Sequence, residues 1–305
     1  MTGVADIGFA PCEICGSVEW RPVRTGAVRD GAFGRLSPDS AVVARCAGCS
    51  VERLSEQHCH GGDIYVSARY RELLAAGEAA REYLASHDVL QLANLKVLWP
   101  ENLRGRTVVD VGCAAGSFLD HVAGLACTTV AIEPCVGYHD SLRERGHQAF
   151  STCPEAVEAG MGDADFVFSF SVIEHVSDPL DFLLGIAHLL GTGGRALVST
   201  PNRRDVLMDL LPADYPAFFY RTVHRWYFDV DSFQVCAQRA GLRVIEARCV
   251  HRFGLSNALR WLRDKRPGGA DPLPEVPSVM ERSWQASLEQ AGTGDYLYFW
   301  LAKAN

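Results

Sequence analysis

Apolar positions along the second half of the chain follow two alternating patterns. Short runs rich in β-branched and aromatic residues predict strands at 107–111, 128–132, 148–150, 165–172 and 196–199. Stretches with apolar residues three and four positions apart predict helices between these runs, at 118–126, 138–145 and 178–191. An alternation of strands and helices predicts a parallel sheet with helices on both faces.

Further elements flank this core on both sides. Residues 64–98 have no proline and are rich in Ala, Leu, Glu and Arg, which predicts one long helix. Asp231 is a candidate N-cap for a later helix that ends at Gly241. The runs 243–247 and 296–302 predict two last strands, and the return of the chain allows the final strand to run antiparallel.

Two insertions interrupt the alternation. The first, at 203–229, is unusually aromatic, and it is either a flap that packs on the core or a lid over an acceptor. The second, at 251–293, begins with a helical pattern at 255–262. It continues into a segment with four prolines, which predicts an extended connection.

Composition and charge exclude several classes of protein. The 305 residues are 48% hydrophobic, which is enough for a large core, but no apolar run reaches the roughly 18 residues of a membrane span. The N-terminus has no basic start followed by an apolar segment, so we expect a cytoplasmic protein. Because the formal net charge is −8 and Lys and Arg are scattered, we expect neither nucleic acid nor a membrane as a partner. The sequence indicates no oligomeric state.

Four of the 11 cysteines form two CxxC pairs, Cys12 with Cys15 and Cys46 with Cys49. Two such pairs can present four thiolates tetrahedrally to one zinc ion, with no open position for water, so the site would be structural. The segments 18–25 and 40–46 predict short strands between the pairs, as in a zinc ribbon.

Details of these pairs leave alternatives open. Gly16 suits the left-handed residue that directs backbone N–H groups at sulfur, whereas the second pair has Ser50 at that place. The cysteines could instead be a redox dithiol or unrelated buried thiols. His58, Cys59 and His60 are either additional ligands or part of a solvated connection.

The turn after residue 111 has the features of a ligand-binding turn. Gly112 and Gly116 allow the backbone to come close to a ligand, and the following helix offers unpaired N–H groups. Glu133 ends the next strand, where a carboxylate can accept hydrogen bonds from both hydroxyls of a ribose. The alternative is a glycine turn of some other α/β fold. The G-x-G-x-x-G pattern typical of nicotinamide enzymes is absent.

Four segments in this order, VVDVGCAAGSF, AIEP, DFVFSFSVIEHVSDPLDFL and GGRALVSTPN, resemble the motif set of class I S-adenosylmethionine-dependent methyltransferases. The resemblance covers about residues 90–305. It implies a Rossmann-like α/β fold whose seven-stranded sheet is mostly parallel with the last strand antiparallel, here joined to a small N-terminal zinc ribbon. The middle glycine of the family turn is Ala114 in this chain, which fits if its φ is below zero.

The same resemblance implies S-adenosylmethionine as cofactor and assigns residues to it. They lie in the turns after the first four strands: Asp110, Gly112, Ala114, Gly116, Phe118, Glu133, Pro134, Thr152 and Ser171. The segment after the third strand matches the family only in part, because it has no acid before Glu155.

His175 is the candidate catalytic base. Methyl transfer from a sulfonium is an in-line displacement, so the protein aligns the acceptor and removes a proton when the acceptor is a hydroxyl. His175 follows the central strand, and Glu174 could fix its tautomer; the alternative is an imidazole that only closes the turn by hydrogen bonds. His224, in the first insertion, is the second candidate.

The segment SVIEHV also resembles the E-x-x-E-H segment of ubiquinone O-methyltransferases and RNA 2′-O-methyltransferases that use a divalent ion. Ser171 stands where that pattern has its first acid, which leaves Glu174, His175 and His224 as ligands. A site with so few carboxylates binds Mg²⁺ weakly, so we favour a reaction without a divalent ion.

Together these observations predict a zinc-ribbon module at 1–62, followed at 63–305 by a helical bridge and a methyltransferase domain. The expected function is methyl transfer to a hydroxyl or amine of a small-molecule metabolite, in natural-product biosynthesis. The zinc module and the tyrosine-bearing helix also resemble sugar C-methyltransferases, which carry a further C-terminal domain for which this sequence has no room. The residues also leave open an RNA-modifying methyltransferase and a non-catalytic cofactor-binding subunit.

Overall fold

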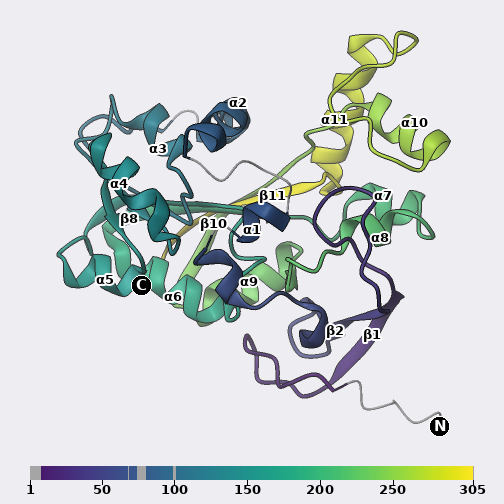
Figure 1. Ribbon diagram of the computed structural model, residues 1–305, viewed down its shortest axis with the longest axis horizontal. Helices are drawn as coiled ribbons and strands as arrows, with labels where there is room; N and C mark the ends of the chain where they lie inside the picture. Colours follow the sequence, from purple (N-terminus) through teal and green to yellow (C-terminus); the bar gives the residue numbers. More distant parts are fainter. Residues whose placement is uncertain (1–7, 68, 74–79, 99–100, 305) are drawn as a thin grey trace. The chain divides into compact units, whose positions relative to one another are not determined.

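The computed structural model describes residues 8–67, 69–73, 80–98 and 101–304 (Figure 1). The chain divides into two compact units. Unit 1 contains the chain up to Cys59 together with 200–233 and 247–298. Unit 2 contains 60–199, 234–246 and the chain from Phe299 onward. The division of the chain into a zinc ribbon at 1–62 and a methyltransferase domain at 63–305 stays a prediction.

The seven-stranded sheet has the order β10-β11-β8-β7-β4-β5-β6 and is mostly parallel with the last strand antiparallel, which confirms the predicted fold class. Its strands are β4 (Thr107–Val111), β5 (Thr128–Ile132), β6 (Gln148–Phe150), β7 (Ala164–Phe170), β8 (Leu190–Pro201), β10 (Leu242–Val250) and β11 (Tyr296–Lys303). Because β4 lies between β5 and β7, the chain reverses its direction of progress through the sheet there, and ligands of such sheets bind beyond the carboxyl ends of the strands at this point.

Short helices connect the strands of unit 2, and α2 lies beside α3 (Figure 1). The helical elements are η2 (Gly62–Tyr65), α1 (Arg69–Leu73), α2 (Ala80–Leu98), α3 (Ser117–Val122), η3 (Val136–Tyr138), α4 (His139–Glu144), α5 (Cys153–Glu158) and α6 (Pro179–Leu189). The start of α6 is confirmed, because Asp178 accepts hydrogen bonds from the backbone N–H groups of Leu180 and Asp181.

Two helix predictions need correction. The single helix expected over 64–98 is wrong, since η2 is a separate 3-10 turn that ends at Tyr65, and the first α-helix of this segment begins only at Arg69. The N-cap of α9 (Val230–Arg239) is Asp229 rather than Asp231, because the Asp229 carboxylate accepts from the backbone N–H of Ser232 at 2.9 Å.

Unit 1 contains a second, four-stranded antiparallel sheet of order β1-β2-β3-β9. The two strands predicted for the zinc ribbon are present, and two were not predicted: β1 (Trp20–Gly26), β2 (Ala41–Cys46), β3 (Glu52–Leu54) and β9 (Trp226–Tyr227). The fourth strand comes from the aromatic insertion. A segment far along the chain therefore completes the sheet of the cysteine-rich module.

The remaining elements of unit 1 are η1 (Glu56–His58), α7 (Val206–Leu210), α8 (Tyr215–Phe219), α10 (Leu255–Asp264) and α11 (Ser278–Ala291). The helix expected at 255–262 is confirmed as α10, and the proline-rich segment after it is irregular, as predicted. The helix α11 was not predicted, although the sequence carries a stop signal for it in Gly292, whose φ is 70°.

The aromatic insertion packs on the core of unit 1. Tyr215, Phe219 and Tyr227 are buried together with Val43 and Leu54 of the four-stranded sheet. Trp261 of α10 joins the same cluster. Apolar burial of this kind stabilises a fold, so these contacts favour the flap over the lid among the two alternatives for this insertion.

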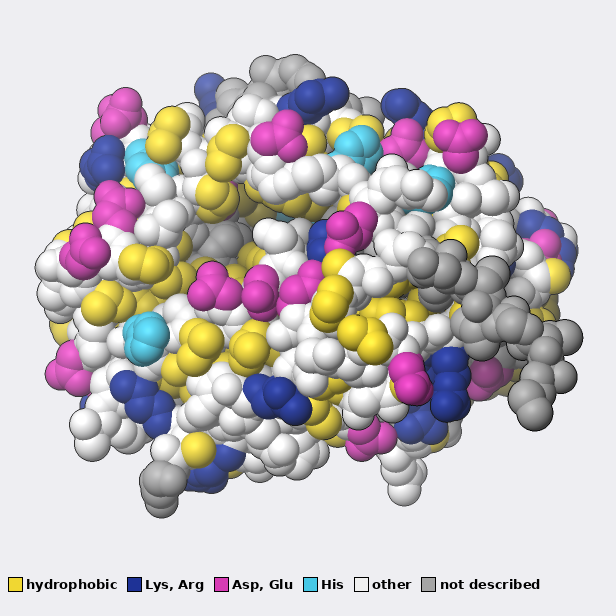
Figure 2. Space-filling view, turned by 90° about the horizontal axis from the view of Figure 1, so that it is seen from below, with side chains coloured by type: hydrophobic (Ala, Val, Ile, Leu, Met, Phe, Trp, Pro, Cys, Tyr) yellow, Lys and Arg dark blue, Asp and Glu magenta, His cyan; other side chains and the backbone are white. Residues whose placement is uncertain are grey.

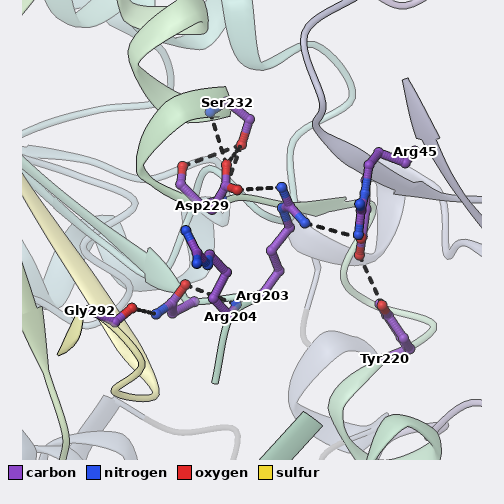
Figure 3. Close-up of polar contacts among 9 residues, drawn as sticks. Arg45, Arg203, Arg204, Tyr220, Asp229, Ser232 and Gly292 are labelled. Carbon is purple, nitrogen blue, oxygen red and sulfur yellow. Dashed lines mark hydrogen bonds and ion pairs between the residues drawn. The ribbon is translucent and has the colours of Figure 1, made fainter. Parts of the chain in front are cut away.

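A buried polar network ties the same insertion to β2 and β3 (Figure 3). Glu52 of β3 accepts hydrogen bonds from Arg45 of β2 at 2.8 Å and from the Tyr220 hydroxyl at 2.9 Å. Arg203 pairs with both Glu52, at 3.3 Å, and Asp229. Because Glu52 is only 3% exposed, these partners supply the hydrogen bonds that water no longer can.

On the face drawn in Figure 2, Lys and Arg side chains are dispersed among Asp and Glu and form no large patch of one charge. Across the described residues, no helix combines the length with the apolar character that a membrane span requires.

Candidate active site

The turn between β4 and α3 is built around two glycines that no other residue replaces without strain. Gly112 and Gly116 have φ of 78° and 83°. A Cβ at Gly112 would lie 2.5 Å from Val172 Cγ2, and a Cβ at Gly116 would lie 2.4 Å from Leu142 Cδ2. The close approach of Gly112 to Val172 also shows that the turns after β4 and β7 touch.

Ala114 in the same turn has φ of 49°, so the expectation of a negative φ is wrong. The backbone adopts a left-handed conformation here although the residue carries a Cβ. Such a conformation costs a non-glycine residue on the order of 1 kcal/mol or more and is characteristic of functional turns.

We expect Ala114→Gly to stabilise the protein by about 1 kcal/mol, because glycine adopts this φ without strain. For a chain of this size the melting temperature should rise by about 2 to 4 °C, measured by differential scanning calorimetry. Ala115→Gly is the matched control, since Ala115 is fully buried and has no positive φ; that variant should lose stability. A fall in the melting temperature of Ala114→Gly would contradict the strain argument.

Glu133 joins the turn after β5 to the turn after β4. Its carboxylate accepts a hydrogen bond from the backbone N–H of Ala114 at 2.8 Å and another from the backbone N–H of Cys135 at 2.9 Å. The side chain is 7% exposed. The ribose assignment of Glu133 stays a prediction, and the structure adds that this carboxylate orders the glycine turn. Pro134 lies between Glu133 and Cys135 and is half-buried.

Asp110, at the carboxyl end of β4, is a second buried carboxyl group at this edge. Burial, with a smaller contribution from the charge of Glu133, raises the pKa of Asp110 to about 8. Buried acids with strongly shifted pKa values are concentrated at functional sites, because a structural core rarely retains an unpaired carboxyl group. The position fits a binding site for a group of positive charge.

The other residues assigned to the cofactor lie in the same set of turns, with differing exposure. Ser171 is exposed directly after β7, with φ of 60°. Thr152 is the N-cap of α5, where its hydroxyl accepts from the backbone N–H of Glu155. Phe118 is 1% exposed between the rings of Phe168 and Phe170, so it can offer a cofactor only its backbone. These assignments stay predictions.

His175 lies among tyrosines that the sequence alone did not assign to the site. Its Nδ1 is 2.9 Å from the Tyr65 hydroxyl, and its ring also packs edge-on against Tyr65 and Tyr70. Both tyrosines come from the segment before α2, more than 100 residues earlier in the chain. The sequence shows that this segment contains tyrosines, but it does not indicate which turn of the sheet they contact.

Glu174 and His224 belong to different compact units. Glu174 is 1% exposed in the same turn as His175. His224 is 5% exposed in unit 1, where its carbonyl accepts a hydrogen bond from Tyr227 and its backbone N–H donates to Arg221. Catalytic roles for both residues stay predictions.

The four cysteines of the CxxC pairs come together in unit 1, with all four sulfurs within 4.8 Å of one another. The Sγ atoms of Cys12 and Cys49 are 3.6 Å apart, and those of Cys15 and Cys46 are 3.4 Å apart. Four sulfurs at about 2.3 Å from a tetrahedral zinc ion would be about 3.8 Å apart, so the donor set fits zinc. The hydrogen bond with Cys49 lowers the pKa of the Cys12 thiol to about 6, which favours a thiolate.

The residue that follows each cysteine pair has a left-handed backbone conformation, which the sequence predicts for Gly16 and which Ser50 also adopts. Gly16 has φ of 75° and Ser50 has φ of 64°, so both pairs are followed by a left-handed residue. The backbone N–H of Gly48 donates to Cys46 Sγ at 3.4 Å. Among the described residues, the cluster contains only the four cysteines of the two pairs, and His58, Cys59 and His60 do not belong to it.

Comparisons with known proteins point to methyltransferases. A family model described as a methyltransferase domain matches residues 78–247, more than half of the chain. The chain is similar to the ubiquinone biosynthesis O-methyltransferase of Dinoroseobacter shibae, with 28% identity over 160 residues that cover 49% of this chain and 64% of the relative. The protein of the same name from Caulobacter sp. (strain K31) is 32% identical over 107 residues, which cover 32% of this chain and 42% of the relative.

The match thus spans less than two thirds of the length of these relatives. Among solved structures, the chain is similar to a SAM dependent methyltransferase from Archaeoglobus fulgidus, with a TM-score of 0.47 and 15% identity. That comparison covers 73% of this chain and 97% of the other.

Proposed function

The chain belongs to the methyltransferase domain family, and on that premise we propose that it transfers a methyl group from S-adenosylmethionine to a hydroxyl or amine of a small-molecule metabolite. The observation that carries the proposal is the meeting of turns at one edge of the sheet: Glu133 binds the backbone of the β4 turn, and Val172 after β7 packs against Gly112. Ligands of parallel sheets bind at such an edge.

The residues present fit this cofactor. Two buried carboxyl groups, Asp110 and Glu133, flank a turn in which Gly112, Ala114 and Gly116 have positive φ. Glu133 would hold the ribose hydroxyls, and Asp110 would face a positively charged group. When bound, S-adenosylmethionine supplies a methyl group activated by a sulfonium.

His175 is proposed to accept the proton of a hydroxyl acceptor. In the tautomer in which Nδ1–H donates to the Tyr65 oxygen, Nε2 keeps its lone pair and can act as base. Tyr65 is then a positioning residue that fixes the tautomer. The names of the similar proteins, ubiquinone biosynthesis O-methyltransferases, support a hydroxyl as acceptor, and a role in natural-product biosynthesis stays a prediction.

We also propose that Cys12, Cys15, Cys46 and Cys49 hold one structural zinc ion. The zinc would stabilise unit 1 and take no part in the transfer, because four thiolates leave no open position.

Cys127 is an exposed free thiol, which supports a reducing compartment such as the cytoplasm.

Glu133→Gln tests the cofactor assignment. The substitution keeps the size of the side chain but removes the charge that strengthens hydrogen bonds from the ribose, so affinity for S-adenosylmethionine should fall about tenfold to a hundredfold. Calorimetry with the purified protein measures it. Glu155→Gln, at the exposed start of α5, is the matched control and should bind as the wild type does. Unchanged affinity in Glu133→Gln would place the ribose elsewhere.

A further inference from the structure

Two arginines of unit 1 are brought together by backbone pairing between distant segments. Arg29 lies in the connection between β1 and β2, and Arg221 lies between α8 and β9. They pair in a parallel bridge, in which the backbone N–H of Arg29 donates to the Tyr220 carbonyl and the backbone N–H of Thr222 donates to the Arg29 carbonyl, each at 2.9 Å. The two side chains therefore start from neighbouring points.

Both guanidinium groups pack against one aromatic ring. The Arg29 guanidinium carbon is 4.2 Å from the centre of the Phe218 ring, and that of Arg221 is 5.9 Å from it. Cation–π contact restrains the two groups without using any of their N–H donors. Phe33 packs edge-on against Phe218 at 5.8 Å and further restricts the ring.

Neither guanidinium has a counter-ion among the described residues. The side chains of Arg29 and Arg221 make no ion pair and no hydrogen bond with any residue that the structure describes, although Arg29 is only 8% exposed. The nearest acid in the sequence, Asp30, accepts instead from Thr222 at 2.8 Å and pairs with Arg35 at 3.2 Å.

Two other arginines of the same unit, each with at most 10% of its side chain exposed, are paired. Arg53 binds Glu13 at 2.5 Å, and Arg203 binds Asp229. Burying a charge without a partner is costly, and folds normally avoid it. Arg29, which is 8% exposed and has no counter-ion among the described residues, is therefore a candidate to bind an anionic ligand together with Arg221.

The donors of these two arginines are accessible. In both side chains only Nε is buried without a hydrogen-bond partner, so the two terminal nitrogens of each guanidinium keep some accessible surface. Burial lowers the pKa of Arg221 to about 10, and the nearby charge of Arg252 acts in the same direction. Arg221 therefore remains a cation at neutral pH, and an anion would be drawn to it and to the neighbouring guanidinium of Arg29.

We propose that Arg29 and Arg221, packed against Phe218, form a binding site in unit 1 for the phosphate group of a small organic phosphate. A guanidinium binds phosphate through two parallel N–H···O bonds, and two such cations match the charge of about −2 that a phosphate monoester carries at pH 7. A carboxylate, with one charge, would leave one arginine without compensation. The proposal does not depend on methyl transfer.

Calorimetry with inorganic phosphate tests the site in the full chain, without any methyl donor, and acetate serves as the carboxylate probe. We expect saturable phosphate binding and weaker or no binding of acetate. Arg29→Met and Arg221→Met keep an unbranched apolar stem against Phe218 but remove the donors, so each should weaken phosphate binding by about tenfold or more. Arg35→Met, an exposed arginine of the same connection, should bind phosphate as the wild type does.

Thermal unfolding without ligand shows whether the variants fold. Because Arg29→Met removes a buried charge that no described acid compensates, its melting temperature should equal or exceed that of the wild type, while the rise that phosphate produces should be lost. Absence of saturable phosphate binding, binding that survives in both variants, or tighter binding of acetate than of phosphate would each overturn the proposal. A loss of methyl transfer with phosphate binding intact would count only against the proposed function.

Discussion

Replacing His175 by Ala is expected to remove turnover while leaving affinity for S-adenosylmethionine unchanged. A hydroxyl is a weak nucleophile until its proton leaves, and a base in hydrogen-bond reach contributes about a hundredfold to ten-thousandfold to the rate. His175 follows β7 at the edge where the β4 and β5 turns also meet, and Tyr65 holds its Nδ1 at 2.9 Å. The loss should therefore appear in kcat with an acceptor identified from metabolite extracts by thermal shift.

Tyr65→Phe distinguishes a base from a residue that only closes the turn. Removal of the hydroxyl leaves the ring contact with His175 but frees the tautomer, so kcat should fall by about tenfold, less than for His175→Ala, with little change in cofactor affinity. His224→Ala should lose less activity than His175→Ala. Activity should persist after EDTA treatment, provided that metal analysis shows the zinc retained.

Two outcomes would contradict this assignment. His175→Ala with the wild-type rate would leave the imidazole a structural role. Activity that returned only on addition of Mg²⁺ would replace the metal-free base by a divalent ion bound by Glu174, His175 and His224.

Purified protein should contain about one zinc ion per chain, and Cys46→Ser should lose it together with the order of unit 1. Structural zinc contributes about 10 kcal/mol or more to the folding of small modules, because the metal binds only the folded thiolate cluster. Cys46 ends β2, the strand that carries Arg45 and pairs with β1 and β3. Loss of the metal should therefore loosen all three strands, which hydrogen exchange of their backbone amides measures.

Cys127→Ser is the control for this experiment, since Cys127 is exposed in unit 2 and outside the cluster. It should keep the zinc and the protected amides of unit 1. A protein prepared under reducing conditions that held no zinc, or Cys46→Ser with full zinc, would favour the redox dithiol or the unrelated thiols instead.

Local patterns in the sequence were sufficient for the elements of the seven-stranded sheet. The strand at 128–132 was predicted to the residue, because β-branched residues between turn signals report directly on a buried strand. The same holds for the N-cap Asp178 and for the left-handed Gly16, whose signals lie within a few positions of the structure they specify.

Long-range features were not accessible in this way. The helix expected over 64–98 failed at its start, where the 3-10 turn η2 ends at Tyr65 and α1 begins only at Arg69, although the composition favours helix throughout. Ala114 adopts φ of 49° because the packed turn determines its conformation, whereas the residue type alone predicts a negative φ. Neither outcome follows from propensity, since tertiary contacts contribute more than the small differences between residues.

The sequence by itself determined the fold class, the four cysteines as a cluster and the turns at the carboxyl edge of the sheet. Each is encoded by residues close together or by short characteristic spacings. Only the tertiary structure decided that Tyr65 meets His175, that β9 completes the sheet of the cysteine-rich module, and that Arg29 and Arg221 share one ring. These pairs are separated by more than 100 residues, and which distant segments meet depends on how the whole core packs.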